Sequence, residues 1–167
     1  GYNPVYEGHK GQIKTAIKMI KDSKKPLIIA GAGVLKSKAS KELFEYAEKT
    51  QTPVAMTLLG LGAFPGSHEL SLGMLGMHGT VPANYATDEA DLVIAAGVRF
   101  DDRIAGNPSK FIENAKVIHI DIDPAEINKN KRADVPIVGD LKHVLSEINQ
   151  AVEPQTHRAV SYTHLTL

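Results

Sequence analysis

Short runs of apolar residues, each followed directly by glycine, are the feature that most limits how this chain can fold. The clearest runs are Pro26–Ala30, Leu92–Ala96 and Val135–Val138. A strand without alternating polar residues is buried on both faces, as in parallel sheets that are covered by helices on both sides. Two stretches show helical spacing, Gly8–Ser23 and Ser40–Thr50. We therefore predict an α/β fold, with a doubly wound, mostly parallel sheet of five to six strands and helices on both faces.

Local signals predict the remaining elements. Further strands are expected at Val54–Leu58 and Lys116–Ile122. Four residues can cap a following helix, because their side chains can accept hydrogen bonds from its free amides: Ser40, Thr80, Asp123 and Asp140. The helix after Asp123 is expected to be short, and the helix after Asp140 to run to about Val152. Irregular structure is expected in Leu59–Gly66 and in a second glycine-dense segment, Leu72–Gly79.

The composition excludes several classes of protein. The chain has 167 residues, with 19 Lys and Arg against 19 Asp and Glu, and no cysteine. The absence of cysteine excludes disulfide scaffolds, cysteine-ligated zinc, iron–sulfur clusters and thiol catalysis. Balanced charge without blocks of like sign offers no surface for a nucleic acid or an anionic membrane. The longest apolar run, Leu92–Val98, is far shorter than the roughly 20 residues of a membrane span, and no signal-peptide pattern is visible, so we expect a cytoplasmic protein.

The residues at the carboxyl ends of the strands carry the functional prediction, because ligands of doubly wound sheets bind there. Glycine at a strand-to-helix turn lets backbone amides approach a phosphate, and Gly31 and Gly33 form such a turn. A plain tight turn is the alternative. The standard dinucleotide fingerprint is incomplete, because Lys36 stands where its third glycine belongs and the first acid at a later strand end is Asp121. The pattern favours a Rossmann-like nucleotide site in an unconventional register.

Charged residues follow the strand that ends at Gly97. Arg99 and Arg103 can pair with a phosphate, or they can pair with Asp101 and Asp102 within their own loop. From composition alone, pairing with a phosphate and pairing within the loop are about equally expected. The neighbouring glycine favours pairing with the phosphate of a ligand.

Other polar residues suggest binding more than catalysis. Asp121 is the candidate for contact with a ribose or an adenine, and we expect Asp123 to point to the opposite face, so that the two form no acid/base pair. Met77 and His78 suit the surface of a flat aromatic ring, although a methionine is more often part of a core. No histidine stands at a metal-ligand spacing and no catalytic motif is visible, so we expect neither a metal nor a catalytic group in this chain.

Five motifs, in order along the chain, resemble the central domain of the acetolactate synthase (acetohydroxyacid synthase) catalytic subunit, from a family of thiamine diphosphate-dependent enzymes. They are Lys25–Gly33, Met56–Gly62, Met74–Gly79, Gly97–Arg103 and His119–Pro124. The resemblance implies one central domain over residues 1–153 and a disordered or foreign tail over 154–167. In that family the central domain holds FAD, which takes no net redox part in the reaction. The Arg-Phe-Asp-Asp-Arg run at 99–103 is typical of the FAD-bearing members.

The resemblance implies a role for each matching residue. The FAD diphosphate is expected near Gly31, Ala32 and Gly33, and the flavin half near Thr57 and Leu58. The isoalloxazine and ribityl portion is expected near Leu75, Gly76, Met77 and His78. The cofactor is expected to run beside Gly97, Val98, Arg99, Phe100 and Asp101, with its adenosine end near Asp121, Ile122 and Asp140. Asp102 and Arg103 match positions near the mouth of the substrate channel, where herbicides bind.

The resemblance also implies a reaction. Intact members decarboxylate pyruvate and condense it with a second 2-oxoacid, in the first common step of valine, leucine and isoleucine biosynthesis. They bind thiamine diphosphate and Mg²⁺ in two further domains that this chain does not resemble, and they form homodimers or homotetramers with a small regulatory subunit. We therefore expect the chain alone to be inactive. The alternatives are a stand-alone NAD- or ADP-binding module without catalysis, and a fragment that binds nothing.

Overall fold

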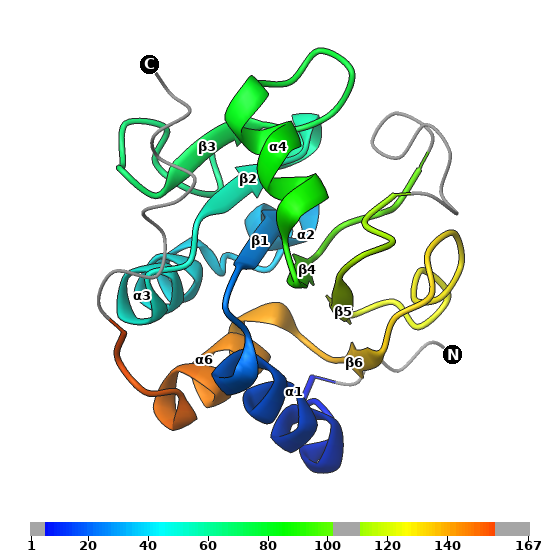
Figure 1. Ribbon diagram of the computed structural model, residues 1–167. Helices are drawn as coiled ribbons and strands as arrows, with labels where there is room; N and C mark the ends of the chain where they lie inside the picture. Colours follow the sequence, from blue (N-terminus) through cyan, green and yellow to red (C-terminus); the bar gives the residue numbers. More distant parts are fainter. Residues whose placement is uncertain (1–5, 102–110, 156–167) are drawn as a thin grey trace.

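Six strands form one parallel sheet. The computed structural model describes residues 6–101 and 111–155. The strands are β1 (Pro26–Ala30), β2 (Val54–Met56), β3 (Ser71–Met74), β4 (Leu92–Ala96), β5 (Lys116–Asp121) and β6 (Val135–Val138). They lie in the order β3-β2-β1-β4-β5-β6, and every neighbouring pair is parallel (Figure 1). This confirms the predicted doubly wound sheet, in which the chain winds outward in both directions from β1 and β4.

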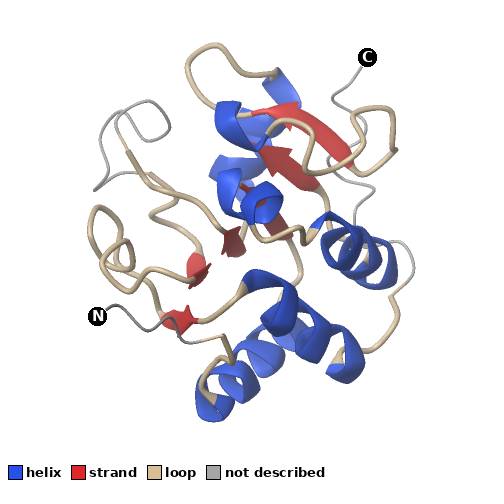
Figure 2. Cartoon of the chain, turned by 180° about the vertical axis from the view of Figure 1, so that it is seen from behind, coloured by secondary structure: helices blue, strands red, loops and turns tan. Residues whose placement is uncertain are grey.

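Helices cover both faces of the sheet. They are α1 (Lys10–Asp22), α2 (Ala32–Lys36), α3 (Ser40–Thr50), α4 (Val81–Glu89) and α6 (Leu141–Ala151), with one 3₁₀ turn, η1 (Leu58–Gly60). Figures 1 and 2 show α1, α3 and α6 grouped on one side of the sheet and α4 on the other. Each face of the sheet packs into its own hydrophobic core, and alternate residues of β1 point to opposite faces. Ile28 packs in the core with α1, α3 and α6, and Leu27 packs in the core with α4. None of these helices combines the length and apolarity that a membrane crossing would need.

The two helix caps predicted at Thr80 and Asp140 are confirmed. The amide of Ala83 donates to Thr80 Oγ1 over 3.2 Å, and the amide of His143 donates to Asp140 Oδ2 over 3.2 Å. Each bond satisfies one of the amides that the first turn of a helix leaves without a partner.

The segment Leu72–Gly79 is not wholly irregular, because it overlaps strand β3 at the edge of the sheet. Gly73 has φ +86°, and the pairing with β2 shifts from Val54–Ser71 to Ala55–Gly73. A four-residue strand interrupted by such a bulge shows no period-two alternation, which is why the sequence pattern did not reveal it.

Two predicted helix starts are wrong. The residue before α3 is Ala39, not Ser40, and no side chain caps the helix. The chain after Asp123 forms turns and no helix. The Asp123 carboxylate accepts from the amide of Ala125 over 2.9 Å, and Asn128, with φ +65°, redirects the chain shortly afterwards. Asp and Ser stabilise turns as readily as helix starts, so neither residue type alone decides between them.

Asp91 fastens the loop between α1 and β1 to the start of β4. Its carboxylate accepts hydrogen bonds from the Ser23 hydroxyl and from the amides of Lys24 and Lys25, at 2.8 and 3.1 Å for the amides. Partial burial acts to raise the pKa of Asp91, but these hydrogen bonds outweigh it and hold the pKa below its usual value.

We expect the Asp91→Asn variant to be less stable than the wild type by about 1–2 kcal/mol near neutral pH, allowing for the exposure of the site. Because the pKa is lower in the folded than in the unfolded chain, the stabilisation is complete above about pH 5 and is lost as the pH falls through the folded-state pKa. Urea unfolding at several pH values measures the difference, with substitution of the exposed Asp88 of α4, Asp88→Asn, as the control. A gap between wild type and Asp91→Asn that persists unchanged at pH 3 would contradict this account.

The turn after β1 packs directly on the backbone that follows β4. A Cβ placed on Gly33 would lie 2.6 Å from the Gly97 Cα, and one placed on Gly31 would lie 2.4 Å from the Gly97 carbonyl oxygen. Gly97 itself has φ +63°, which ends β4 and turns the chain. Only glycine allows two backbones to approach so closely, so these residues fix the spacing of the two central strand ends.

Replacing Gly33 with Ala should therefore lower the free energy of unfolding by about 2–3 kcal/mol, because the backbone of Gly97 must move. Gly66→Ala is the matched control, since nothing lies within 4 Å of the added Cβ there and neither glycine has a positive φ. That variant should stay within about 0.5 kcal/mol of the wild type. Equal urea midpoints for the two variants would show that the close approach is not required.

Candidate functional site

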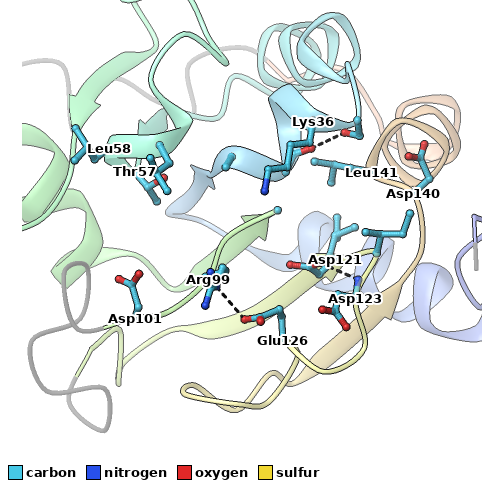
Figure 3. A pocket seen from close by; sticks show the side chains of 17 residues that line it. Lys36, Thr57, Leu58, Arg99, Asp101, Asp121, Asp123, Glu126, Asp140 and Leu141 are labelled. Carbon is cyan, nitrogen blue, oxygen red and sulfur yellow. Dashed lines mark hydrogen bonds and ion pairs between the residues drawn. The ribbon is translucent and has the colours of Figure 1, made fainter. Parts of the chain in front are cut away.

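A pocket of about 450 Å³ opens at the carboxyl edge of the sheet (Figure 3). Its walls come from the segments that follow β1, β2, β4, β5 and β6, so it lies where β1 and β4 send the chain in opposite directions. This crevice is the place where doubly wound sheets bind their ligands, and the volume is within the usual range of small-molecule sites.

Ten of the residues predicted to bind a cofactor line this pocket. They are Ala32, Gly33, Thr57, Leu58, Gly97, Arg99, Asp101, Asp121, Ile122 and Asp140. They come from five strand ends that are far apart in sequence. The parallel arrangement brings them together, because every strand presents its carboxyl end at the same edge.

Seven other predicted residues do not line the pocket: Gly31, Leu75, Gly76, Met77, His78, Val98 and Phe100. Leu75, Val98 and Phe100 are buried in the core that contains α4, and Met77 is 89% exposed. The substrate-channel residues, Asp102 and Arg103, lie outside the described residues.

The segment around Gly76 does not line the pocket, but two hydrogen bonds connect it to α4. The Asn84 side chain accepts from the Gly76 amide and donates to the Gly76 carbonyl, both over 2.9 Å. The loop therefore presents Met77 to solvent in a fixed backbone conformation, with Gly76 at φ +114°.

The glycine turn does not offer its own glycine amides to a ligand. The amide of Gly31 donates to the Ala96 carbonyl over 3.0 Å, and that of Gly33 donates to the Gly97 carbonyl over 3.1 Å. Ala32, the first residue of α2, donates to no described residue. The two glycines thus serve close packing, and Ala32 is the one residue of the turn whose amide stays available within the described structure.

Two cations face the pocket from opposite walls. Lys36 reaches in from α2, and Arg99 follows β4 (Figure 3). Arg99 is 65% exposed, and its Nε lies 3.3 Å from Glu126 Oε2. Among the described residues, this carboxylate comes from outside the loop that carries Arg99. It belongs to the turn after β5.

Five carboxylates also line the pocket, Asp101, Asp121, Asp123, Glu126 and Asp140. Burial raises the pKa of Asp121, with smaller opposing contributions from the Asp123 amide and His119. The expectation that Asp121 and Asp123 point apart is wrong: both line the pocket, and the Asp123 amide donates to Asp121 Oδ1 over 2.9 Å. Residues two apart share one face of a strand, and here the second also follows the strand end.

Sequence reasoning missed seven lining residues, Lys36, Ser37, Leu59, Ile120, Asp123, Glu126 and Leu141. In the sequence Lys36 stands out only as a missing glycine of the fingerprint, although its place one turn after Gly33 is a usable signal. Nothing in the sequence marks Glu126, because its position depends on the turns that follow Pro124.

The described lining suits binding more than covalent chemistry. It holds no histidine, and the hydroxyl of its one serine, Ser37, donates to the Gly33 carbonyl over 2.7 Å. Within residues 6–101 and 111–155, no three His, Asp or Glu side chains gather as metal ligands would. The cations can pair with an anionic group, and the carboxylates can accept from hydroxyl or amino groups.

Comparison with known proteins identifies relatives along most of the chain. It is 55% identical to a probable acetolactate synthase large subunit from Methanocaldococcus jannaschii over 91% of its own length and 26% of that relative. It is 51% identical to the acetolactate synthase large subunit of Buchnera aphidicola subsp. Schizaphis graminum, over 93% of this chain and 28% of the relative. An acetolactate synthase from Mycobacterium leprae is 53% identical over 89% of this chain and 24% of the relative.

The chain spans about a quarter of the length of these relatives. The sequence model of a single domain covers residues 13–148, which include every described strand and all of the pocket lining. That domain is described as the central domain of thiamine pyrophosphate enzymes. The chain belongs to this family of thiamine pyrophosphate enzyme central domains.

Proposed function

We propose that this chain is the FAD-holding central part of an acetolactate synthase large subunit. The observation that carries the proposal is the pocket at the divergence of β1 and β4, whose cations and carboxylates lie where the two ends of a dinucleotide would need them. The similarity to acetolactate synthases supports the identity of the whole enzyme.

The diphosphate of FAD would lie between Ala32 and Lys36 of α2 on one wall and Arg99 on the opposite wall. The Ala32 amide can donate to a phosphate oxygen, and the two cations can neutralise its charge. Arg99 already forms an ion pair with Glu126, which limits the directions in which its remaining N–H groups can point.

The adenosine end of FAD fits the wall formed by Asp121, Ile122 and Asp140. One oxygen of Asp121 accepts from the Asp123 amide, so Oδ2 remains to accept from a ribose hydroxyl. One oxygen of Asp140 likewise accepts from the His143 amide. Burial destabilises the charged form of Asp121, and a hydroxyl that donates to it would offset that cost.

The flavin half would leave the pocket past Thr57 and Leu58. Thr57 Oγ1 accepts from the Gly60 amide over 3.1 Å, so its hydroxyl hydrogen can point to a ligand. Leu58 and Leu59 are 57% and 69% exposed, and such apolar surface suits a flat ring. We include Leu75, Gly76, Met77 and His78 as the far contact of the ring system, since Asn84 holds that loop in place.

In the intact enzyme, FAD would supply a fixed aromatic wall and no redox step, and this chain's residues would bind and orient it. The decarboxylation of pyruvate and its condensation with a second 2-oxoacid would use thiamine diphosphate and Mg²⁺ held by other domains. Asp102 and Arg103 would lie near the substrate channel. The intact enzyme would be a homo-oligomer that binds a small regulatory subunit, and it would be located in the cytoplasm. The domain would end near residue 153.

A fluorescence titration tests the cofactor. We expect the chain to quench the fluorescence of FAD on binding and to bind FAD more tightly than NAD, because the Leu58 side of the pocket offers apolar surface to a ring larger than nicotinamide. ADP should compete with FAD. Preference for NAD over FAD would instead support the stand-alone nucleotide module, and no shift in melting temperature with any of the three would mean that the fragment binds nothing.

Replacing Arg99 with Ala should weaken FAD binding by about 1.5–3 kcal/mol, because a charge-assisted bond to the diphosphate is lost. Lys25→Ala is the matched control: Lys25 is half exposed and also forms an ion pair, with Glu89 at 3.7 Å, but it lies before β1 at the opposite edge of the sheet. That variant should bind FAD like the wild type. An unchanged dissociation constant for Arg99→Ala would show that Arg99 pairs only with Glu126.

The isolated chain should produce no acetolactate from pyruvate, even with FAD, thiamine diphosphate and Mg²⁺ added, because no described residue forms a metal-diphosphate site. A colorimetric acetoin assay after acid treatment measures the product. Product above the level of heat-denatured protein would overturn this assignment of roles.

A further inference from the structure

His119 lies fully buried on β5, directly beneath the segment that carries Arg99. Its side chain is 0% exposed, and its Nε2 lies 2.8 Å from the Val98 carbonyl oxygen. Because a carbonyl can only accept, Nε2 must carry the proton. Nδ1 finds no partner among the described residues.

The hydrogen bond compensates for the way β4 ends. In the parallel ladder Ala96 pairs with Ile120, and the Gly97 amide donates to the Ile120 carbonyl. The positive φ of Gly97 then turns the chain out of the ladder. The Val98 carbonyl meets the His119 ring there, where an apolar side chain would leave it buried without a donor.

The same ring also fixes the residue on the other side of Arg99. Phe100 packs edge-on against His119, with ring centroids 5.1 Å apart, and Phe111 lies 6.0 Å from Phe100. Arg99 is thus held between two neighbours that contact one imidazole, while its own side chain points into the pocket (Figure 3). Burial lowers the pKa of His119 and keeps the ring neutral, which preserves the donor on Nε2 alone.

We propose that His119 is a positioning residue for the pocket: its Nε2–H bond to the Val98 carbonyl and its contact with Phe100 aim Arg99 at the phosphate of a bound nucleotide. This inference rests on the proposed function for its ligand. His119 would act without touching the ligand, and this role accounts for a polar ring at a core position on β5.

The test compares two substitutions of nearly equal size. His119→Gln keeps a donor at the distance of Nε2, and His119→Met removes it. We expect His119→Met to bind ADP about five- to tenfold more weakly than the wild type and His119→Gln to bind within about twofold. Adenosine, which has no phosphate, should bind all three proteins within about twofold of one another.

A double-mutant cycle separates positioning from general loosening. In an Arg99→Ala background, His119→Met should change ADP affinity by less than about twofold, because the cation that it positions is gone. If His119→Met weakens ADP binding in that background as much as it does in the wild type, or weakens adenosine binding as much as ADP binding, the inference is overturned. If His119→Met does not fold, His119→Asn, whose amide is too short to reach the carbonyl, replaces it in the same comparison.

Two measurements keep the inference separate from the cofactor proposal. Nitrogen-15 spectra of the wild-type imidazole should show the proton on Nε2, and a proton on Nδ1 would overturn the inference whatever the protein binds. If neither FAD nor ADP binds, the proposed function fails. The inference is then tested by backbone relaxation measurements over residues 98–101. These residues should be more mobile in His119→Met than in His119→Gln, and equal mobility in the two variants would overturn the inference.

Discussion

The contact between the backbones of Gly33 and Gly97 is the constraint on which the site depends. It brings the turn after β1 against the segment after β4, within a distance that no side chain would allow. The crevice between the two outward-winding halves of the sheet therefore begins at a defined point. Ala32 and Lys36 of α2 face Arg99 across the pocket because the turns that carry them are locked together in this way.

The pocket divides its charges in a manner that suits a long ligand with unlike ends. Lys36 and Arg99 follow β1 and β4, and one carboxylate, Asp101, lies two residues after Arg99. Asp121 ends β5, and Asp123 and Asp140 follow β5 and β6. Anionic groups are favoured at the first end, and groups that donate hydrogen bonds are favoured at the second. Glu126 lies between them and pairs with Arg99, so that the cation is partly neutralised before any ligand arrives.

Polar side chains from distant elements hold the loops at both ends of the strands. His119 binds the Val98 carbonyl, Asn84 binds both polar groups of Gly76, and Asp91 binds the loop before β1 at the other edge of the sheet. Each bond satisfies a backbone group that the sheet ladder leaves without a partner. Segments that follow strands are irregular, and such bonds give them fixed positions without regular structure.

The sequence by itself determined the class of fold and much of the site, because buried parallel strands require continuous apolar runs and end where glycine or charge appears. Thr80 and Asp140 were recognisable as caps for the same local reason. Only the tertiary structure revealed the short bulged strand β3, the pairing of Arg99 with Glu126, and the use of the Gly31 and Gly33 amides within the fold. These depend on which segments lie side by side in space, and on the direction in which turns after Gly97 and Asp123 send the chain. No local pattern of residues encodes those distances, since they arise from packing between elements that are far apart in sequence.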